Sequence, residues 1–431
     1  MIVTDKIEQE VDGKRKELIE RSRRIVVKVG TNVLTDQRGV LCQHRIESLV
    51  EQLNRIHGTG KDLVLVSSGA IGTGMGCLNL KQRPTDLPHL QACAAVGQSL
   101  LIQRYRELFA PFAIHPAQIL LTAGDLENRT RYLNVRNTLL TLFEYRCLPI
   151  INENDTVSVK EICFGDNDYL SALVSDLLQA DLLILLTNVA GLYSVDPNSK
   201  EILQADSSEL PKSDLLGFAS KDKSNSNREE KSEAKIDQMS YRDSAQLISE
   251  VPYLDQKTME LAGLSKSQLG TGGMRSKLKA VRLAVHSGTA VIMADGSAEN
   301  ILDTIWTGKT VGTYFHSNRV RLSARKRWFG FFAYPVGEYQ IDAGAKKAIL
   351  EKGKSLLPIG VIHVVGQFKK GAVVRVVDPE GKEIARGLSN YSSEIAVQFC
   401  RKSTDEIESR FGTMLYGELI HRDNLTLIEE N

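Results

Sequence analysis

The chain has 431 residues, 42% of them hydrophobic and 25% charged, and a formal net charge of +1. This balance is ordinary for a soluble globular protein with a substantial core, and the length predicts more than one domain. A net charge so close to zero excludes a global field that draws the chain to nucleic acid or anionic membrane, and no apolar run approaches the length of a membrane span.

Residues 1–23 form a charged extension without the apolar core of a secretion signal. This segment could extend as a helix or stay loose, and nothing in it suggests chemistry. The cysteines form neither a CxxC pair nor the spacing of a zinc site, and scattered thiols are typical of a reducing cytoplasm. We therefore expect a cytoplasmic protein with no metal held by protein ligands.

From Arg24 onward, short apolar strands alternate with helical stretches. The predicted strands are 24–29, 63–66, 119–121, 148–151, 182–186 and 290–293. The helices predicted among them are 46–56, 88–109, 130–145, 167–179 and 274–286. Strands that are apolar throughout indicate a largely parallel sheet covered on both faces. The sequence therefore predicts a three-layer α/β/α sandwich over 24–330, with ligands bound beyond the carboxyl ends of the strands.

Polar residues fall at those strand ends: Lys28, Ser68, Asn152 to Asp155, and Thr187. A lysine at a strand tip can aim its ammonium into a cleft, or reach solvent as an ordinary surface side chain. Ser68, before a predicted helix, suits an anion or a purely structural N-cap. Thr187-Asn188 can contact adenine or ribose, or simply end its strand. The convergence of these positions at one edge favours a site.

Two Asx-rich turns, Asn152-Glu153-Asn154-Asp155 and Gly165-Asp166-Asn167-Asp168, flank one short segment. Their carboxylates could receive a substrate ammonium and hold lysines. Neither has the ligand spacing of a calcium loop. Turn and N-cap chemistry alone would explain either cluster, but both together, beside two strand-end loops, favour function.

A glycine-rich loop, Gly270 to Lys277, precedes a helix that runs to His286. Glycines before a helix leave backbone N–H groups unobstructed for an anion, and the lysine adds a mobile positive charge. The spacing is not that of a P-loop, which requires Gly-Lys-Ser/Thr at its end. The loop predicts either a phosphate-binding turn of another nucleotide fold or an ordinary surface turn.

Two further regions break the alternating pattern. The stretch 206–250 is polar and charged, and we expect it to be a mobile insertion because it cannot bury enough apolar surface. Residues 335–425 contain a short helical pattern and strand-like pieces, with a hairpin-type turn at Asp378 to Lys382. This region predicts a small, separate, β-rich domain.

Taken in chain order, these segments resemble the amino acid kinase superfamily and, within it, the glutamate 5-kinase family. The resemblance covers 24–425 apart from the insertion. The strings that carry it are Val27-Lys28-Val29-Gly30-Thr31-Asn32, Ser67-Ser68-Gly69-Ala70-Ile71, Ala94-Ala95-Val96-Gly97-Gln98, Ile151-Asn152-Glu153-Asn154-Asp155, Gly165-Asp166-Asn167-Asp168 and the loop at 270–277.

The resemblance implies ATP-dependent phosphorylation of the side-chain carboxylate of L-glutamate to L-glutamyl 5-phosphate, the first step of proline biosynthesis. Two alternatives stay open: a kinase of another carboxylate such as acetylglutamate, and an RNA-binding protein that acts through its C-terminal domain. Mg²⁺ is expected to accompany ATP on its phosphates, with few direct protein ligands.

The resemblance also implies residue roles. Lys28 and Lys277 would flank the transferring phosphoryl group, and Asp168 would hold both. Glutamate-binding positions are matched by Ser68, Asp155 and Asn167. The positions expected to bind ATP, partly through N–H groups of Gly30 and the 271–276 backbone, are Lys28, Gly30, Thr187, Asn188, Thr271, Gly272, Gly273, Met274, Arg275, Ser276 and Lys277. Relatives often carry Asp at the position of Asn188.

The C-terminal region is similar to a PUA domain, notably at Leu357 to Gly360 and Gly366 to Gly371. Such domains often bind RNA, but 335–431 holds 13 Lys and Arg against 14 Asp and Glu, which is not a basic footprint. The resemblance further implies feedback inhibition by L-proline at a site that overlaps that of glutamate, and a homo-oligomer of two or four chains.

Overall fold

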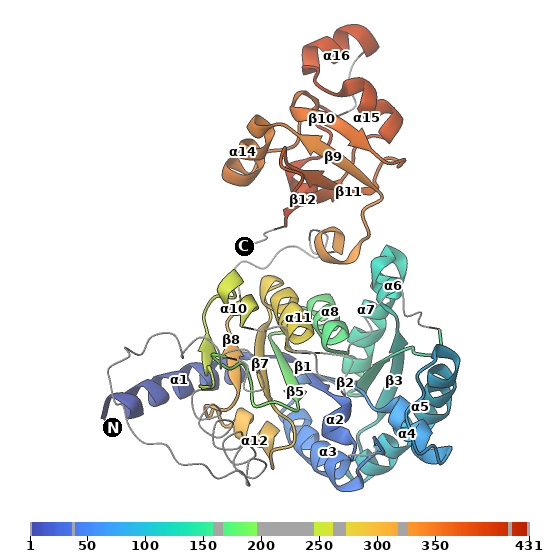
Figure 1. Ribbon diagram of the computed structural model, residues 1–431, viewed down its shortest axis with the longest axis vertical. Coiled ribbons are helices and arrows are strands. Elements are labelled where there is room, and N and C mark those ends of the chain that lie inside the picture. The colour runs from blue at the N-terminus through green and yellow to red at the C-terminus, as the bar shows by residue number, and fades with distance from the viewer. Residues whose placement is uncertain are drawn as a thin grey trace, which may run out of the picture.

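The residues that the structure describes build an eight-stranded and a five-stranded sheet (Figure 1). The computed structural model describes residues 2–36, 39–157, 167–195, 245–261, 273–317, 326, 328–412 and 416–428. In the larger sheet, the strand order is β3-β4-β2-β1-β5-β7-β8-β6. Its strands are β1 (Arg24–Val29), β2 (Asp62–Ser67), β3 (Pro116–Leu121), β4 (Leu148–Glu153), β5 (Leu182–Thr187), β6 (Glu250–Val251), β7 (Ala290–Asp295) and β8 (Thr313–Phe315).

Pairing from β3 across to β7 is parallel throughout. β8 runs antiparallel to β7, and β6 pairs in parallel with β8. All six strands predicted from apolar runs are present, which confirms the largely parallel α/β fold. The two short strands β6 and β8 extend the sheet beyond the prediction. They carry too few residues to show a pattern of their own.

Helices cover both faces of this sheet (Figure 1). On one face lie α2 (Thr31–Leu34), α3 (Gln43–Gly58), α4 (Ala70–Cys77), α5 (Leu87–Phe109) and α12 (Ile301–Trp306). On the other lie α6 (Ala123–Glu127), α7 (Arg129–Glu144), α8 (Asn167–Leu178), α10 (Gln256–Glu260) and α11 (Met274–His286). None of the described helices has the length and apolarity needed to cross a membrane.

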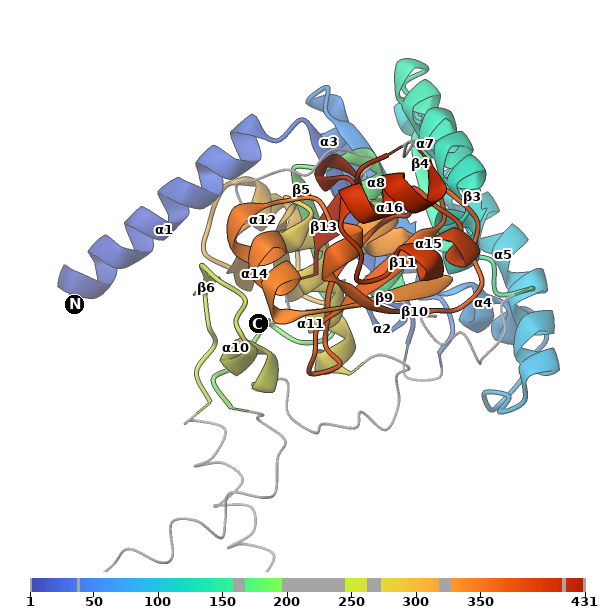
Figure 2. The same ribbon diagram turned by 90° about the horizontal axis from the view of Figure 1, so that it is seen from above.

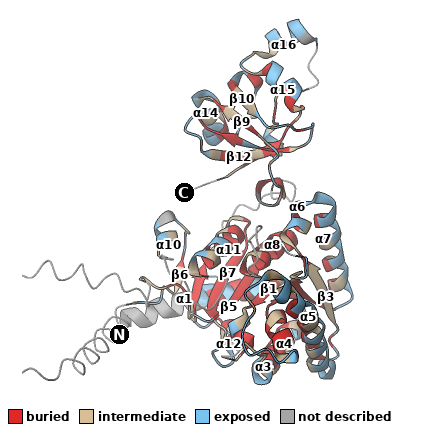
Figure 3. Ribbon diagram, turned by 45° about the vertical axis from the view of Figure 1, so that its right-hand side comes forward, coloured by how far each residue is buried: buried red, intermediate tan, exposed pale blue. Residues whose placement is uncertain are grey.

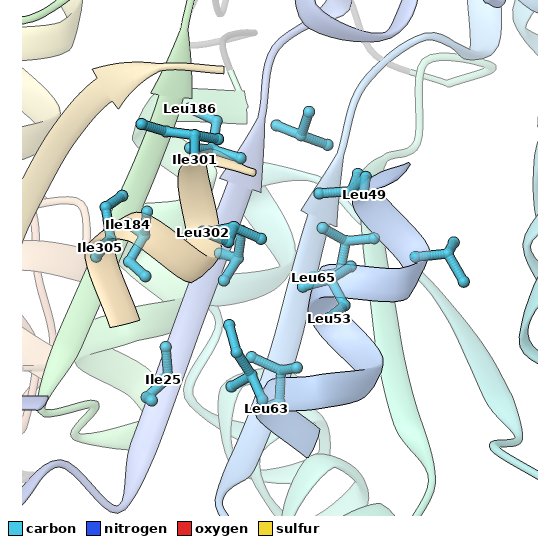
Figure 4. Close-up of a cluster of buried hydrophobic side chains, with 14 of the residues drawn as sticks. Ile25, Leu49, Leu53, Leu63, Leu65, Ile184, Leu186, Ile301, Leu302 and Ile305 are labelled. Atoms are coloured by element: carbon cyan, nitrogen blue, oxygen red, sulfur yellow. The ribbon is translucent and has the colours of Figure 1, made fainter. Parts of the chain in front are cut away.

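The alternation of side chains along each strand feeds two cores, one on each face. In β1, Ile25 and Val27 pack with α3, α5 and α12, whereas Val26 packs with α7, α8 and α11. Figure 4 shows part of the first core, and Figure 3 shows the strands largely buried. Each such side chain contributes roughly 1.5–3 kcal/mol when fully buried. This burial on both faces explains why the strands read as continuous apolar runs.

The charged N-terminal extension forms helix α1 (Ile2–Arg21), so the helical alternative holds for this segment. Leu18 and Ile19 join the first core. Much of the predicted insertion, 206–244, lies outside the described residues. Residues 245–250, however, belong to the sheet region: Ile248 N–H donates to Leu192 O at 2.8 Å, and β6 begins at Glu250. The boundary predicted at 250 was therefore set too late.

The smaller sheet has the order β10-β9-β11-β12-β13. Its strands are β9 (Gly337–Ile341), β10 (Val361–Val365), β11 (Val373–Val377), β12 (Glu383–Leu388) and β13 (Leu425–Leu427), accompanied by α14 (Ala343–Lys352), α15 (Ser393–Phe399) and α16 (Thr404–Phe411). The predicted turn joins β11 to β12, where Asp378 N–H donates to Lys382 O at 2.9 Å. A core of its own confirms a separate β-rich domain.

One helical turn, η5 (Trp328–Phe332), connects the two cores. Trp328 packs against the core beneath α7, α8 and α11, and also against the cluster of Phe329 with Val373 and Leu388. The guanidinium of Arg129 lies 5.6 Å from the Trp328 ring centroid. Phe329, assigned to the first domain by the predicted boundary at 330, thus packs with the C-terminal sheet.

Candidate active site

A buried aspartate joins two lysines at the carboxyl edge of the larger sheet. Lys28 lies near the end of β1, Lys277 in the first turn of α11, and Asp168 in the first turn of α8. The ammonium of Lys28 pairs with Oδ1 of Asp168, and Nζ of Lys277 donates to Oδ2 at 3.1 Å. The exposed fractions of Lys28, Lys277 and Asp168 are 4%, 8% and 1%. Charges so deeply buried persist only when they are paired.

The lysines determine the ionisation of Asp168. Burial alone raises the pKa of this carboxyl group, but the charges and hydrogen bonds of Lys28 and Lys277 outweigh burial and lower the pKa to about 2. Asp168 is therefore a carboxylate at neutral pH, and each of its oxygens orients one ammonium group. The structure thus brings together the three residues for which the family resemblance implied a joint role.

Next to this cluster, the side-chain amide of Asn167 donates hydrogen bonds to three acceptors. Its Nδ2 donates to Ser68 Oγ at 2.8 Å, to Asn152 Oδ1 at 3.0 Å, and to Ser67 O at 3.3 Å. The Oδ1 atom of Asn167 is buried, and no described residue donates to it. An acceptor held in this way and left without a donor suits a ligand N–H group. Ser68 and Asn167, predicted together, meet here where the ends of β2 and β4 lie beside the start of α8.

Gln98 orients the Asn152 side chain of this network. Its Oε1 accepts a hydrogen bond from Nδ2 of Asn152 at 2.7 Å, which leaves Oδ1 of Asn152 turned toward Asn167. Helices α4 and α5 approach closely enough for this contact because their crossing is lined by glycine. A Cβ at Gly97 would lie 1.8 Å from Ala70 O, and one at Gly74 would lie 1.9 Å from Cys93 O. Sequence reasoning assigned no role to Gln98, although it closes the Ala-Ala-Val-Gly-Gln string.

Asp155 lies two residues beyond β4 and is partly buried. Burial, and then the charge of Glu153, raise its pKa to about 6, while Arg83 acts in the opposite direction. Among the described residues, no hydrogen bond or ion pair joins Asp155 to Ser68 or Asn167. The structure therefore leaves Asp155 at a neighbouring strand end, separate from the Asn167 network. Asp166, also in the predicted turn, lies outside the described residues.

The glycine-rich loop is described from Gly273, the N-cap of α11; Thr271 and Gly272 lie outside the described residues. The amides of Met274 and Arg275 begin the helix and have no intrahelical acceptor, since the first amides of any helix lack one. Those of Ser276 and Lys277 instead donate to Gly273 O at 3.1 and 3.3 Å. The prediction that the Ser276 amide points at a ligand is therefore wrong, because it closes the first helical turn.

Gly30 needs a similar correction. Its N–H donates to Leu186 O at 3.2 Å, which continues the pairing of β1 with β5, so this amide is not available to a phosphate as predicted. A Cβ at Gly30 would nevertheless lie 3.4 Å from Nζ of Lys28, so the glycine keeps the space beside the ammonium open. At the end of β5, Thr187 is buried and Asn188 is exposed.

A model of the amino acid kinase family matches residues 23–226, and a PUA domain model matches 337–411. The glutamate 5-kinase of Caldanaerobacter subterraneus subsp. tengcongensis is 41% identical over 94% of this chain and 98% of its own length. That of Citrifermentans bemidjiense is 39% identical over 96% of this chain and 100% of its own. The chain belongs to the glutamate 5-kinases of the amino acid kinase family.

Family membership confirms the predicted arrangement of a kinase domain followed by a PUA domain. Among solved structures, the UMP kinase of Bacillus anthracis aligns with 69% of this chain at 12% identity and a TM-score of 0.41. The kinase family model covers β1 to β5, and with them Lys28, Ser68 and Asp168 in the first turn of α8. Helix α11 with Lys277 lies beyond that match and joins the site through Asp168.

Proposed function

We propose that this protein transfers the γ-phosphoryl group of ATP to the side-chain carboxylate of L-glutamate and releases L-glutamyl 5-phosphate and ADP. The observation that carries the proposal is the buried carboxylate of Asp168, which binds Lys28 and Lys277 through opposite oxygens. The names of the relatives, which are glutamate 5-kinases aligned over nearly the whole chain, supply the substrate.

The reaction needs little covalent chemistry from the protein. A carboxylate oxygen of glutamate attacks the γ-phosphorus, the bond from that phosphorus to the β,γ-bridging oxygen breaks, and the electron pair leaves with ADP. Glutamate is already ionised at neutral pH, so no general base is required. The obstacle is repulsion between two anions, and catalysis then comes from positioning and from fixed positive charge.

In this proposal, Lys28 and Lys277 stabilise the phosphoryl oxygens during transfer. Asp168 does not touch the reacting atoms, but it fixes the two ammonium groups before the substrates arrive. An ammonium group oriented in advance costs no reorganisation during the reaction, and in a buried site its effect is larger than in water. Gly30 keeps the space beside Lys28 free for the phosphate.

Glutamate recognition is assigned to Ser68, Asn167 and Asp155. The buried Oδ1 of Asn167 is suited to accept from the α-ammonium group, and the Ser68 hydroxyl is suited to donate to a substrate carboxylate. Asp155 would pair with the same ammonium from the adjacent strand end, and this pairing would lower its raised pKa on binding.

The ATP site is assigned to the carboxyl edge of the larger sheet near β5 and α11, beside the glutamate site. Thr187 and Asn188 at the end of β5 would contact the nucleoside, and Gly273, Met274 and Arg275 at the start of α11 would bind phosphates, together with Thr271 and Gly272. Mg²⁺ would be carried on the ATP phosphates, where it neutralises their charge. Both oxygens of Asp168 already bind lysines, so this carboxylate is not assigned to the ion.

Regulation and assembly are proposed from the family alone. L-proline would compete with glutamate at the Asn167 network, the enzyme would act in the cytoplasm, and two or four copies would associate. No role in RNA binding is assigned to the C-terminal domain, because its charge is balanced.

The proposal is tested by coupled measurement of ADP release with L-glutamate, L-aspartate and N-acetyl-L-glutamate as separate acceptors. Hydroxylamine in the assay traps an acyl phosphate as its hydroxamate. We expect ADP and hydroxamate to form together, and chiefly with L-glutamate. Faster turnover of N-acetyl-L-glutamate, or no acceptor-dependent ADP release, would contradict the proposal.

A further inference from the structure

Arg15, in helix α1, is an arginine with only 1% of its surface exposed. Its guanidinium donates to three backbone carbonyls: Nη1 to Val311 O at 2.5 Å, and Nη2 to Ser249 O at 2.6 Å and to Gly312 O at 3.3 Å. It also lies 5.9 Å from the ring centroid of Tyr314. The planar fork of arginine suits several acceptors at once, which a lysine ammonium matches poorly.

The three carbonyls belong to two segments that are far apart in the sequence. Ser249 directly precedes β6, whereas Val311 and Gly312 precede β8. Strands β6 and β8 pair in parallel at the end of the larger sheet. Loss of the guanidinium would remove the side-chain donor of Val311 O and of the buried Gly312 O, whereas Ser249 O would still accept from the Tyr314 amide at 2.9 Å. An unmade buried hydrogen bond costs more than an average bond contributes. Arg15 of α1 therefore forms hydrogen bonds to the residues directly before both strands.

Figure 2 shows α1 running outward from the main body of the protein, and further contacts hold its second half. Asp12 accepts from Thr310 Oγ1 at 2.5 Å. The backbone of Lys16 passes so close to Gly308 that a Cβ there would lie 2.8 Å from Lys16 Cβ. At the other end of α1, the Lys61 ammonium donates to carbonyls of its last turn, among them Ile19 O at 2.9 Å. The helix is thus docked along its second half.

Thr313, next to Gly312, links these two segments to the loop that follows β5. Its Oγ1 donates to Ile248 O at 2.6 Å and accepts from the Leu192 amide at 2.8 Å. Ile248 N–H in turn donates to Leu192 O at 2.8 Å, and Ser194 N–H donates to Gln246 O at 2.8 Å. The loop that follows β5 is therefore bonded to the same two segments that Arg15 holds.

We propose that Arg15 is a positioning residue for the nucleotide half of the site. By holding the carbonyls of Ser249 and Gly312, it keeps Thr313 and residues 246–248 where they bind the loop after β5. The inference rests on the proposed function, in which Thr187 and Asn188, directly before and at the start of this loop, contact ATP. It gives the N-terminal helix, which suggested no chemistry in the sequence, a specific effect on ATP rather than on glutamate.

The test compares matched variants in the full chain. Arg15→Met keeps an apolar stem and removes the fork, and Arg15→Lys keeps the charge without the fork. Thr313→Val removes the inner hydroxyl at nearly constant shape. As controls, Arg21→Met removes a charge from the same helix that pairs with Glu17 near the surface, and Thr310→Val removes the Asp12 bond. The readouts are KM for each substrate, calorimetric affinity for MgADP, and amide exchange of 191–195 and 245–251.

We expect Arg15→Met and Thr313→Val to raise KM for ATP and weaken MgADP binding by about tenfold, the effect of one unmade buried hydrogen bond. KM for glutamate should change by no more than roughly twofold. Amide exchange of 191–195 and 245–251 should rise in both variants. In each readout, Arg15→Lys should lie between wild type and Arg15→Met, and both controls should resemble wild type. If Arg15→Met does not fold, the KM for ATP and the MgADP affinity of Thr313→Val decide the test.

Two results would overturn the inference. If both variants only lower the melting temperature and bind MgADP normally, α1 serves merely to cover the sheet edge. If the wild-type chain does not bind MgADP, the loop is no nucleotide site and the inference fails. A wild-type chain that binds MgADP but does not phosphorylate glutamate would instead refute the proposed reaction, and the MgADP comparison would still decide the role of Arg15.

Discussion

Lys277 donates through Nζ to Oδ2 of Asp168 at 3.1 Å, although 109 residues separate them in the chain. The first turns of α8 and α11 meet through this contact, and Lys28 from β1 occupies the other oxygen of the same carboxylate. Three separate elements thus converge on one buried acid. The arrangement makes the position of each ammonium depend on Asp168.

Asp168→Asn should remove most activity while keeping the shape of the side chain. An amide cannot neutralise two buried ammonium groups, so we expect kcat to fall at least about 10²-fold and stability to fall by about 3 kcal/mol. Steady-state kinetics and thermal melting measure the two effects. Asp176→Asn, in the same helix, is the matched control for losing a buried carboxylate in α8. Wild-type kcat in Asp168→Asn would contradict the role given to the carboxylate.

Titration of Asp155 should make glutamate binding depend on pH near neutrality, whereas titration of Asp168 should not. The pKa of Asp155 is raised to about 6 and that of Asp168 lowered to about 2, so only Asp155 changes charge between pH 5 and 7. Protonated Asp155 cannot attract the α-ammonium, and kcat/KM for glutamate should therefore decline as pH falls below about 6. The same profile measured for Asp155→Asn should be lower and flat in this range. An unchanged profile in that variant would remove Asp155 from glutamate binding.

The same carboxyl group gives a stability test with a defined sign. A folded-state pKa of about 6 lies above the ordinary value of 3.8, so the folded protein takes up a proton more readily than the unfolded chain. Ionised Asp155 thus destabilises the fold above pH 6, and the penalty vanishes below about pH 4. We expect Asp155→Asn to raise the melting temperature at pH 8 and to have little effect at pH 4. Equal shifts at both pH values would contradict the raised pKa.

Gly97→Ala tests whether the close crossing of α4 and α5 supports the site. The added Cβ would meet Ala70 O at 1.8 Å, so the helices must separate and Gln98 must shift with them. We expect a loss of about 1–3 kcal/mol in stability and a higher KM for glutamate, with KM for ATP nearly unchanged. Gly58→Ala, at the end of α3 with nothing within 4 Å of its added Cβ, is the control. Equal behaviour of the two variants would show that the crossing tolerates a methyl group.

The sequence predicted the larger sheet well, because strands buried on both faces carry a continuous apolar signal. The joint roles of Lys28, Asp168 and Lys277 were implied by the resemblance to the amino acid kinase superfamily, and the structure places the three side chains together. Strand β6 escaped prediction because two residues carry no pattern, and it pairs only through β8, more than 60 positions away.

The hydrogen-bond details could not be predicted from local pattern. The Gly30 amide was predicted to donate to a phosphate, but its acceptor, Leu186 O, lies in another strand. Gln98 reads as an ordinary helical residue until the glycine crossing brings it to Asn152. Arg15 reads as one of many charges in a polar helix, and only the folded chain shows that its acceptors are three backbone carbonyls of two distant segments. In each case the deciding partner is distant in sequence.

The most direct measurement is glutamate-dependent ADP release by Lys28→Met and Lys277→Met, with thermal melting as a check on the fold. Lys279→Met, which removes an exposed lysine from the same helix as Lys277, is the control. If both buried lysines stabilise the transferring phosphoryl group, each substitution should lower kcat by at least about 10²-fold while the control keeps wild-type activity. Near-normal ADP release by both folded variants would contradict the proposed mechanism.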